Sequence, residues 1–562
     1  MNMKKSIFFG LALLVIAAFV FAAAFGSCEA IASTTGDALL DEKIVLDAQS
    51  AKAANGVRSE FFAVAKDSSG CTYAAGYQYG SEEYSYGTVR VSGSVSDSDN
   101  AVIVKYDKNG TALWARSVNA GSKESWFGGV AVDDSGRVYV VGVQGSTGVY
   151  NYGNNVTVAG SFDGGNALIV QYDSNGTAQW AKSVTGGGKQ SRFSCVAANS
   201  SGVYVGGKQT GSGTFNYGAG VSVAGSSDDD DDDESGNAVL VKYNSSGNAL
   251  WAKSVAGAGE GSIFYGVSAD GSGKVYAVGS QRGDVAYDYG NSITATGGGH
   301  SVSNAVIVQY DSAGTAQWAK SVSGGSVGNS VFYAVSADKL GTLYAAGSQS
   351  NTVSYNYGSA SVAGSGSLNA VLVKYNSAGT VQWASVSSGG EGGSGGGAYD
   401  DGNAQSLKTL QNTAMSAFTG VAVDKLGKVC VSGAQNNTGV YLYNGASAQG
   451  NFSAYNALIV KYNSSTGEAQ WAQAPTSSGG TSIGTKSLFS LPGSEALAAV
   501  NDDAESTSNG SNASFFYGIA ADGLGGFSTV GYQTGNGTFV YGNDISAQSD
   551  GTNNNAVMVE YK

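Results

Sequence analysis

The chain has 562 residues, of which 86 are glycine and 2 are proline, and its formal net charge is −14. An acidic chain with six scattered arginines lacks the basic patches that binding to nucleic acid or to an anionic membrane surface requires. Short apolar runs separated by Gly, Asn and Asp, with no helical periodicity after the N-terminus, indicate an all-β chain of many short strands.

The N-terminal segment is typical of a secretory signal peptide over residues 1–27. Met1–Lys5 is basic and Ile7–Phe25 is almost wholly apolar. The sequence Phe25-Gly26-Ser27-Cys28 resembles a relaxed bacterial lipobox, which predicts Cys28 as the lipidated N-terminus of an envelope protein. Two alternatives stay open: ordinary cleavage after Ala32, which gives a secreted protein, and an uncleaved apolar anchor. Contact with a membrane is therefore expected only through a lipid or the leader.

A unit of about 65 residues then repeats seven times, the mark of a repeat architecture. Each unit opens with Phe, and a Val or Ile follows three residues later, which predicts a first strand, A. A tight turn such as Asp133-Asp134-Ser135-Gly136 leads to strand B, because Asp accepts backbone hydrogen bonds and Gly adopts positive φ. The opening residues are Phe61, Phe127, Phe193, Phe264, Phe332, Phe418 and Phe516.

Strand B ends in Gly-x-Gln in every copy, and an excursion with an aromatic-x-aromatic signature follows, its second aromatic always Tyr. The glutamines are Gln78, Gln144, Gln209, Gln281, Gln349, Gln435 and Gln533. The second aromatic, eight residues after each glutamine, is Tyr86, Tyr152, Tyr217, Tyr289, Tyr357, Tyr443 and Tyr541.

Strand C begins with Asn-Ala, and strand D carries Trp after a second tight turn. Six units contain this Trp, at Trp114, Trp180, Trp251, Trp318, Trp383 and Trp471. The seventh unit ends after strand C, so we expect Lys43–Ala51 to supply its missing outer strand.

This organisation predicts one seven-bladed β-propeller of four-stranded antiparallel blades with long B–C excursions, closed by an N-terminal strand. The propeller is expected over residues 42–562, after a linker over residues 28–41. Two segments, 387–416 and 475–512, are predicted insertions.

The repeat resembles a known family. GVAVDDSGRVYVVG at Gly129–Gly142 and NALIVQYDSNGTAQW at Asn166–Trp180 are similar to the bacterial seven-bladed β-propeller repeat of exported and surface proteins. The resemblance covers nearly the whole mature chain. It implies the propeller fold and an extracytoplasmic location, and it implies no activity, because the family has no shared catalytic residues.

The repeated Gln and Tyr residues allow two interpretations. Identity in seven copies is what a fold requirement produces, with Gln amides bonding to loop backbone and Tyr side chains packing between excursions. The alternative is an aromatic and amide surface for glycans or extended peptides. Its candidate ligand-binding residues are Tyr86, Tyr152, Tyr217, Tyr289, Tyr357, Tyr443, Tyr541, Gln144 and Gln281.

The sequence offers no catalytic cluster and predicts no cofactor. His300 is the only histidine, so a catalytic triad could use only this residue. Zinc sites need clustered His or Cys, which the sequence lacks. No metal site is expected, although Asp228, Asp230, Asp232 and Glu234 in an acidic run could weakly gather Ca²⁺. Cys71, Cys195 and Cys430 are too few and too far apart for a disulfide framework and are interpreted as small buried residues.

We therefore expect a binding or adhesion scaffold at the cell surface and not an enzyme. All long connections fall on the B–C/D–A side of the predicted blades, so this side is the expected binding face, for a glycan or a protein partner. A propeller enzyme acting on polysaccharide and a purely structural envelope protein are the alternatives.

Overall fold

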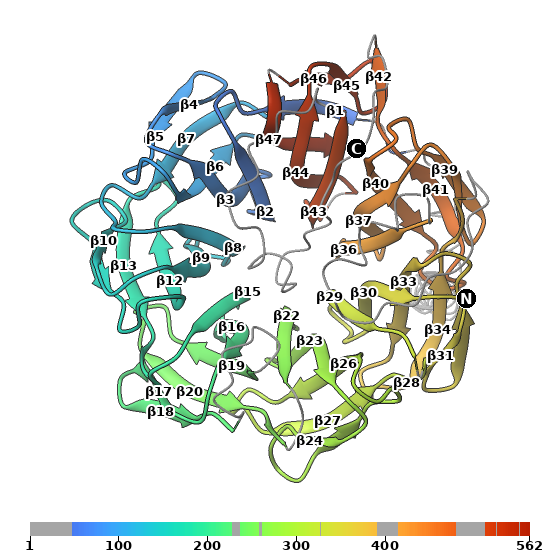
Figure 1. Cartoon of the computed structure of the whole chain (residues 1–562), viewed down its shortest axis with the longest axis horizontal. Helices are drawn as coiled ribbons and strands as arrows, with labels where there is room; N and C mark the ends of the chain where they lie inside the picture. Colours follow the sequence, from blue (N-terminus) through green and yellow to red (C-terminus); the bar gives the residue numbers. More distant parts are fainter. Residues whose placement is uncertain are drawn as a thin grey trace, which may run out of the picture. The chain divides into compact units, whose positions relative to one another are not determined.

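Strands and turns make up the computed structural model, with no helix among the residues that it describes (Figure 1). Within this part of the chain the main elements are seven four-stranded antiparallel sheets. The all-β class and the four-stranded antiparallel sheets are thereby confirmed. The described residues are 46, 48–226, 236–257, 261–325, 327–390, 414–478, 512–523, 525–549 and 551–562.

Each sheet contains one strand of each type, A to D, and we number the sheets in chain order. The first three are β2 (Ser59–Lys66), β3 (Thr72–Tyr79), β6 (Asp99–Tyr106) and β7 (Ala112–Ser117); β8 (Ser125–Val132), β9 (Val138–Gln144), β12 (Asn166–Tyr172) and β13 (Ala178–Ser183); and β15 (Ser191–Asn199), β16 (Gly202–Gln209), β19 (Asn237–Tyr243) and β20 (Ala249–Ser254). The next two are β22 (Ser262–Ala269), β23 (Val275–Arg282), β26 (Ser303–Tyr310) and β27 (Ala316–Ser321); and β29 (Ser330–Ala337), β30 (Leu343–Ser350), β33 (Leu368–Tyr375) and β34 (Val381–Val386). The last two are β36 (Ser416–Val423), β37 (Val429–Asn436), β40 (Tyr455–Tyr462) and β41 (Ala469–Gln473); and β43 (Ala513–Ala521), β44 (Phe527–Gly535), β47 (Gly551–Tyr561) and β1 (Ala48–Ala53).

The tight turns form as their residues predict. In the A–B turn of the second sheet, Asp133 Oδ1 accepts hydrogen bonds from the backbone N–H groups of Ser135 at 2.9 Å and Arg137 at 3.1 Å. Gly136 closes this turn at a φ of +76°, a conformation that residues with a Cβ rarely adopt. The sequence therefore fixes the hairpin locally.

Consecutive sheets share their apolar cores. Every residue of β9 and β12 is buried, because a sheet with two apolar faces needs a neighbour on each side. Tyr139 and Ile169 of the second sheet lie in one cluster with Phe193 and Val205 of the third. The series returns to its start, since β2 contacts β43, β44 and β47 of the seventh sheet.

The fourth strand of the seventh sheet comes from the other end of the chain. β1 pairs antiparallel with β47, with Ala51 opposite Val559, as we expected. The strand runs from Ala48 to Ala53, and residues 43–45 and 47 of the predicted segment Lys43–Ala51 lie outside the described residues. Leu46 is buried ahead of the strand in a cluster that includes Phe452, so its apolar character reflects side-chain packing and not strand pairing.

Tryptophan on strand D joins one sheet to the next. Trp114 lies over Gly176 in the C–D turn of the second sheet, where an added Cβ would come within 2.8 Å of the indole. Its Nε1 donates a hydrogen bond to the carbonyl of Ser174 at 3.1 Å. The same hydrogen bond crosses the next four boundaries, in the pairs Trp180–Ser245, Trp251–Ser312, Trp318–Ser377 and Trp383–Ser464.

The B–C excursions are β-hairpins, which the sequence analysis did not resolve. The hairpins are β4 (Glu83–Tyr86) with β5 (Val89–Ser92), β10 (Val149–Asn151) with β11 (Thr157–Ala159), β17 (Thr214–Gly218) with β18 (Val221–Ala224), β24 (Ala286–Asp288) with β25 (Thr294–Thr296), β31 (Ser354–Tyr357) with β32 (Ala360–Ala363), β38 (Val440–Tyr443) with β39 (Ala446–Gln449), and β45 (Thr538–Val540) with β46 (Ser546–Gln548). Five hairpins pair with a short strand that follows strand D of the preceding sheet, namely β14 (Thr185–Gly186), β21 (Ala256–Gly257), β28 (Ser323–Gly324), β35 (Ser388–Gly389) and β42 (Thr476–Ser478).

The predicted insertions 387–416 and 475–512 thus begin as strands, β35 and β42. Most of each insertion lies outside the described residues, as do the predicted leader 1–27 and linker 28–41. No helix in the described part of the chain is long and apolar enough to cross a membrane.

Candidate functional site

The repeated Tyr and Gln residues form hydrogen-bonded pairs inside the protein. In each copy the tyrosine hydroxyl donates to Oε1 of the glutamine eight residues earlier, at 2.6 Å for Tyr289 and Gln281 and at 3.2 Å for Tyr152 and Gln144. Gln281 Nε2 donates to the carbonyl of Ala295, which ties strand B to the hairpin. The other five pairs are Tyr86–Gln78, Tyr217–Gln209, Tyr357–Gln349, Tyr443–Gln435 and Tyr541–Gln533.

These interior positions correct the prediction that the repeated Tyr and Gln side chains form a ligand-binding surface. None of the seven tyrosines is more than 2% exposed, and the seven glutamines have no exposed surface. Burial raises the pKa of the hydroxyls of Tyr152 and Tyr289 well above the ordinary value, as it does at the other five. Each Tyr–Gln hydrogen bond holds a hairpin to its sheet. A residue pair that all seven copies share is what the fold requires.

The remaining candidates from the sequence do not meet in one site. Cys28 and Asp228–Glu234 lie outside the described residues. His300 pairs with Asp284 at 3.0 Å on the surface, and 79% of its side chain is exposed. Within the described ranges no group of three or more His, Cys, Asp or Glu could hold a metal ion. Cys195 and Cys430 are buried and free, and burial raises the pKa of both thiols.

A different set of side chains comes together where the A strands converge. One cluster, which we call the A-strand cluster, contains buried residues of three sheets, and residues of two more sheets pack against it. Phe62 lies 5.3 Å from Tyr517 and 6.2 Å from Trp126, measured between ring centroids. The cluster consists of Phe62, Tyr77, Ala434, Tyr455, Phe515, Tyr517 and Tyr532, with Trp126 and Tyr333 packed against it.

Glu60 places a buried carboxylate beside these aromatic side chains. Its Oε1 accepts hydrogen bonds from Tyr77 at 2.9 Å and from Asn554 at 2.7 Å, and its Oε2 accepts one from Tyr517 at 3.1 Å. Burial raises the pKa of Glu60 above its ordinary value, although these three donors and the charge of Arg58 act in the opposite direction. Glu60 is thus a buried titratable group whose pKa is raised, which makes it a candidate for a functional carboxyl.

The A-strand positions beside the repeated Phe differ from copy to copy. The residue before it is Glu60, Trp126, Arg192, Ile263, Val331, Ala417 and Phe515. The residue after it is Phe62, Gly128, Ser194, Tyr265, Tyr333, Thr419 and Tyr517. A ligand without sevenfold symmetry touches the repeats unequally, so these variable positions fit a binding site better than the invariant ones. The sequence analysis missed Glu60 because it followed what the copies share.

The cluster lies at the end of the sheets from which the excursions leave. Glu60 is the second residue of β2, and it is paired with Tyr77, two residues before the end of β3. The hairpin of β4 and β5 begins four residues after Tyr79. The variable A-strand positions and the long connections therefore share one side, which is the predicted B–C/D–A face.

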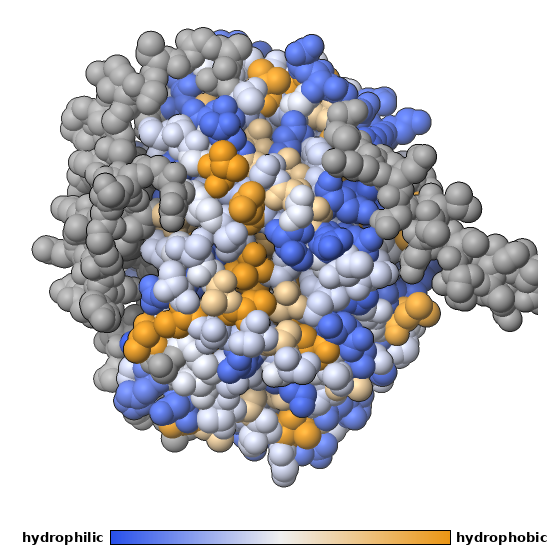
Figure 2. Space-filling view, turned by 90° about the vertical axis from the view of Figure 1, so that its right-hand side faces the viewer, coloured by the Kyte–Doolittle hydropathy of each residue, from blue (hydrophilic) through white to orange (hydrophobic). Residues whose placement is uncertain are grey.

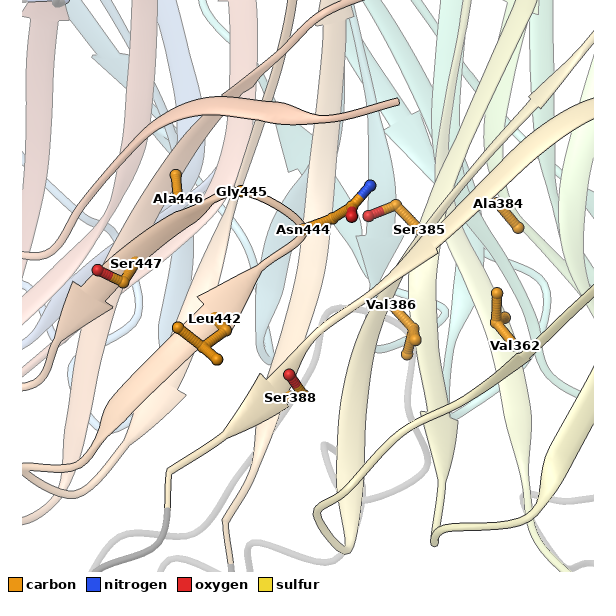
Figure 3. Close-up of a pocket in the computed structure, with 10 residues that line it drawn as sticks. All are labelled: Val362, Ala384, Ser385, Val386, Ser388, Leu442, Asn444, Gly445, Ala446 and Ser447. Atoms are coloured by element: carbon orange, nitrogen blue, oxygen red, sulfur yellow. The ribbon is translucent and has the colours of Figure 1, made fainter. Parts of the chain in front are cut away.

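A separate pocket of about 480 Å³ opens between β34 and the hairpin of β38 and β39 (Figure 3). Val386 and Leu442 contribute apolar side chains to its lining, and the side chains of Ser385 and Asn444 point toward each other (Figure 3). Apolar side chains form a broken band over this side of the molecule (Figure 2). None of its lining residues is titratable, so the pocket offers no acid–base chemistry; they are Val362, Ala384, Ser385, Val386, Ser388, Leu442, Asn444, Gly445, Ala446 and Ser447.

Comparisons with known proteins give no relative in sequence. No protein-family model matches the chain, and no curated protein matches it. Two solved structures of a polysaccharide lyase, the ulvan lyase of family PL25, align with a TM-score of 0.31 and 11% identity, covering 74% of this chain and 96% of the lyase chain. One of them has -[GlcA(1-4)Rha3S]- bound. A likeness of this size assigns this chain neither a family nor an activity.

Proposed function

We propose that the seven sheets are the blades of one closed β-propeller of the bacterial exported-repeat type. Three observations support this proposal: consecutive sheets share cores, the first sheet contacts the seventh, and side chains of five sheets, four of them contributing from strand A, meet in or against one cluster. Closure would leave no blade with an uncovered face, and β1 covers the edge of β47. The A strands would then line the axis.

We further propose that this propeller is a surface scaffold that binds a glycan at the axial end where the excursions leave. The observation that carries the proposal is the A-strand cluster, whose residues vary between repeats that are otherwise alike. Trp126, Tyr265 and Tyr333 are partly exposed there, and Tyr265 lies 5.7 Å from Tyr333 between ring centroids. Aromatic and apolar side chains with a few polar groups beside them are the usual lining of a ligand site.

Glycan arrays followed by titration calorimetry test this function. Trp126→Ala and Tyr333→Ala are expected to weaken binding at least tenfold. Leu340→Ala is the matched control, because Leu340 is 88% exposed in an A–B turn at the opposite end of the sheet, and it should bind as the unchanged protein does. Equal loss in the control would place the site on the other face. Binding of extended peptides and of no glycan would make the partner a protein.

Glu60 favours a second candidate, an enzyme acting on polysaccharide. Burial raises the pKa of the Glu60 carboxyl, as a general acid requires, and two tyrosine hydroxyls lie within hydrogen-bond distance of it. Incubation with bound glycans separates the two functions. Product release that Glu60→Gln abolishes would identify an enzyme, and retention of intact glycan would support the scaffold.

We also propose that the protein is exported and held in the cell envelope through Cys28, with secretion as the alternative. The basic and apolar N-terminal sequence and the relaxed lipobox support this location.

A further inference from the structure

The boundary between the seventh and first sheets lacks the tryptophan found elsewhere. On strand D of the first sheet, Trp114 stands opposite Lys105. At the corresponding position of the seventh sheet, Ser50 of β1 stands opposite Glu560. Ser50 faces Gly110 of the first sheet, as Trp114 faces Gly176. A small hydroxyl thus replaces an indole at this boundary, and both its apolar contact and its hydrogen bond to the turn are lost.

The strand C residue opposite that position is also different. In three sheets a lysine there donates to the same turn carbonyl as the tryptophan does, as Lys105 does to Ser174 at 3.1 Å. Glu560 has no hydrogen to donate when ionised and requires donors instead. The seven residues at this position are Lys105, Gln171, Lys242, Gln309, Lys374, Lys461 and Glu560.

Three further departures from the repeat occur at the same boundary. Lys66 stands where the other sheets have Val132, Ala198, Ala269, Ala337, Val423 and Ala521. Thr72 stands where they have Val138, Val203, Val275, Leu343, Val429 and Phe527. Ser528 stands where they have Tyr73, Tyr139, Tyr204, Tyr276, Tyr344 and Cys430.

These four exceptional residues form one network, which we call the closure network. Lys66 Nζ lies 2.6 Å from Glu560 Oε2 and 2.6 Å from Ser528 Oγ. Thr72 and Ser528 each donate to Glu560 Oε1 at 2.7 Å. The side chains of Lys66 and Glu560 are 3% and 2% exposed. Lys66 and Thr72 belong to the first sheet, and Ser528 and Glu560 belong to the seventh. The network therefore joins these two sheets and no other pair.

We propose that the closure network makes the first sheet pack against the seventh sheet and not against another one. The chain then closes in the correct order. A buried ion pair adds little stability over apolar residues of similar size, and its best-attested use is to specify which surfaces meet. Seven similar sheets can pack in a wrong order, a characteristic failure of repeat proteins. If the first sheet packed against the sixth sheet, Lys66 would lie against Lys461 and not against Glu560. Two like charges would then be buried together.

Charge exchange tests this role in the full-length chain. Lys66→Glu and Glu560→Lys are each expected to lower the yield of refolded monomer at least tenfold, measured by size exclusion with light scattering. Each should also speed amide hydrogen exchange in β2 and β47 at least tenfold, with little change in β22 and β29. The variant carrying both changes should recover most of the loss. Lys242→Gln, which copies the residue of two other sheets at the same strand C position, is the control and should refold normally.

An uncharged pair separates specificity from stability. Lys66→Ala with Glu560→Gln copies the boundary between the second and third sheets, where Gln171 and Ala198 occupy these positions. We expect a chain of normal thermal stability that refolds into mixed monomers and larger species. Clean refolding of this variant to monomer would overturn the proposal. The proposal would also be overturned if the variant with both charge changes gave no more refolded monomer than the summed losses of the two single changes predict.

Discussion

At the scale of single residues, the repeated side chains and the exceptional ones have different roles. Trp251 illustrates the first kind, since its indole lies over Gly314 and donates to the carbonyl of Ser312 at 3.1 Å. Glu60 illustrates the second kind, since no other copy has an acid at its position. The structural roles are thus repeated around the sheets, whereas the acid at the Glu60 position occurs in one copy.

Removal of a boundary tryptophan should cost more stability than removal of the tryptophan in the A-strand cluster. We expect Trp251→Ala to lower the free energy of unfolding by about 3 kcal/mol, because both the packing and a hydrogen bond are lost. Trp126→Ala should cost about 1 kcal/mol, since its side chain packs at the edge of the cluster. Trp251 is partly exposed as well, but it covers Gly314 and donates a hydrogen bond across the boundary. Guanidinium denaturation measures both values. The opposite order would contradict the assignment of Trp251 to the sheet boundary.

Glu60 should make stability depend on pH in a defined direction. Its pKa is raised above 4.5 in the folded protein, so the folded state holds the proton more tightly than the unfolded state does. Its contribution to stability is fully present below pH 4.5 and is lost as the pH rises towards the folded-state pKa. Each unit of difference in pKa corresponds to about 1.4 kcal/mol.

Glu60→Gln is the matched variant for this effect, because it keeps the shape and cannot ionise. The difference in unfolding free energy between the unchanged protein and this variant should decrease as the pH rises above 4.5 and then level off. Urea denaturation at a series of pH values measures it. A difference that stays constant between about pH 4 and pH 8 would show that Glu60 does not titrate between the two states.

At the scale of elements, β1 is the strand with the largest sequence separation from its partner. It pairs with β47 near the opposite terminus, and its residues carry little strand signal of their own. Its burial pattern repeats every three residues and does not alternate, because the register with β47 shifts between Ala48 and Ser50 and brings Ala48 and Ala51 to the same face. That face meets the core of the sixth and seventh sheets. Tertiary contact therefore fixes this element.

Deletion of Asp41–Ala53 should expose the edge of β47 and remove an outer strand from the seventh sheet. We expect a clear drop in thermal stability together with concentration-dependent association, because an unpaired edge is a template for another chain. Differential scanning calorimetry and light scattering measure the two effects. A deleted chain that melts as the full chain does and stays monomeric would mean that β1 is dispensable for the seventh sheet.

At the scale of the whole molecule, two polar networks join the first sheet to the seventh. The closure network lies at the end of the A–B turns, and Glu60 with Tyr517 and Asn554 lies at the other end. The proposed binding end and the proposed closure of the propeller therefore depend on the same boundary. A ligand at the A-strand cluster would contact residues of both terminal sheets.

Anchoring of the protein is predicted at Cys28. In a host that lipidates exported proteins, labelling with a fatty-acid analogue should mark the unchanged protein, and Cys28→Ala should remove the mark because the thiol is the acceptor. Cys71→Ala is the control, since Cys71 lies in an A–B turn far along the chain, and it should keep the label. An unlabelled protein in such a host would leave secretion or an uncleaved leader as the mode of export.

The sequence by itself determined the repeat, the four strands of each unit and the tight turns, because strand alternation and turn chemistry are local properties. It also indicated that the last sheet needs a strand from the N-terminal side. Only the tertiary structure decided that the repeated Tyr and Gln residues are interior, that the excursions are hairpins and that Glu60 meets Tyr517. Residues far apart in the chain meet through packing between sheets, and a local pattern carries no information on which distant residue lies across a boundary. The closure network is the clearest case, since Lys66 and Glu560 are exceptions whose partner appears only when the first sheet touches the seventh.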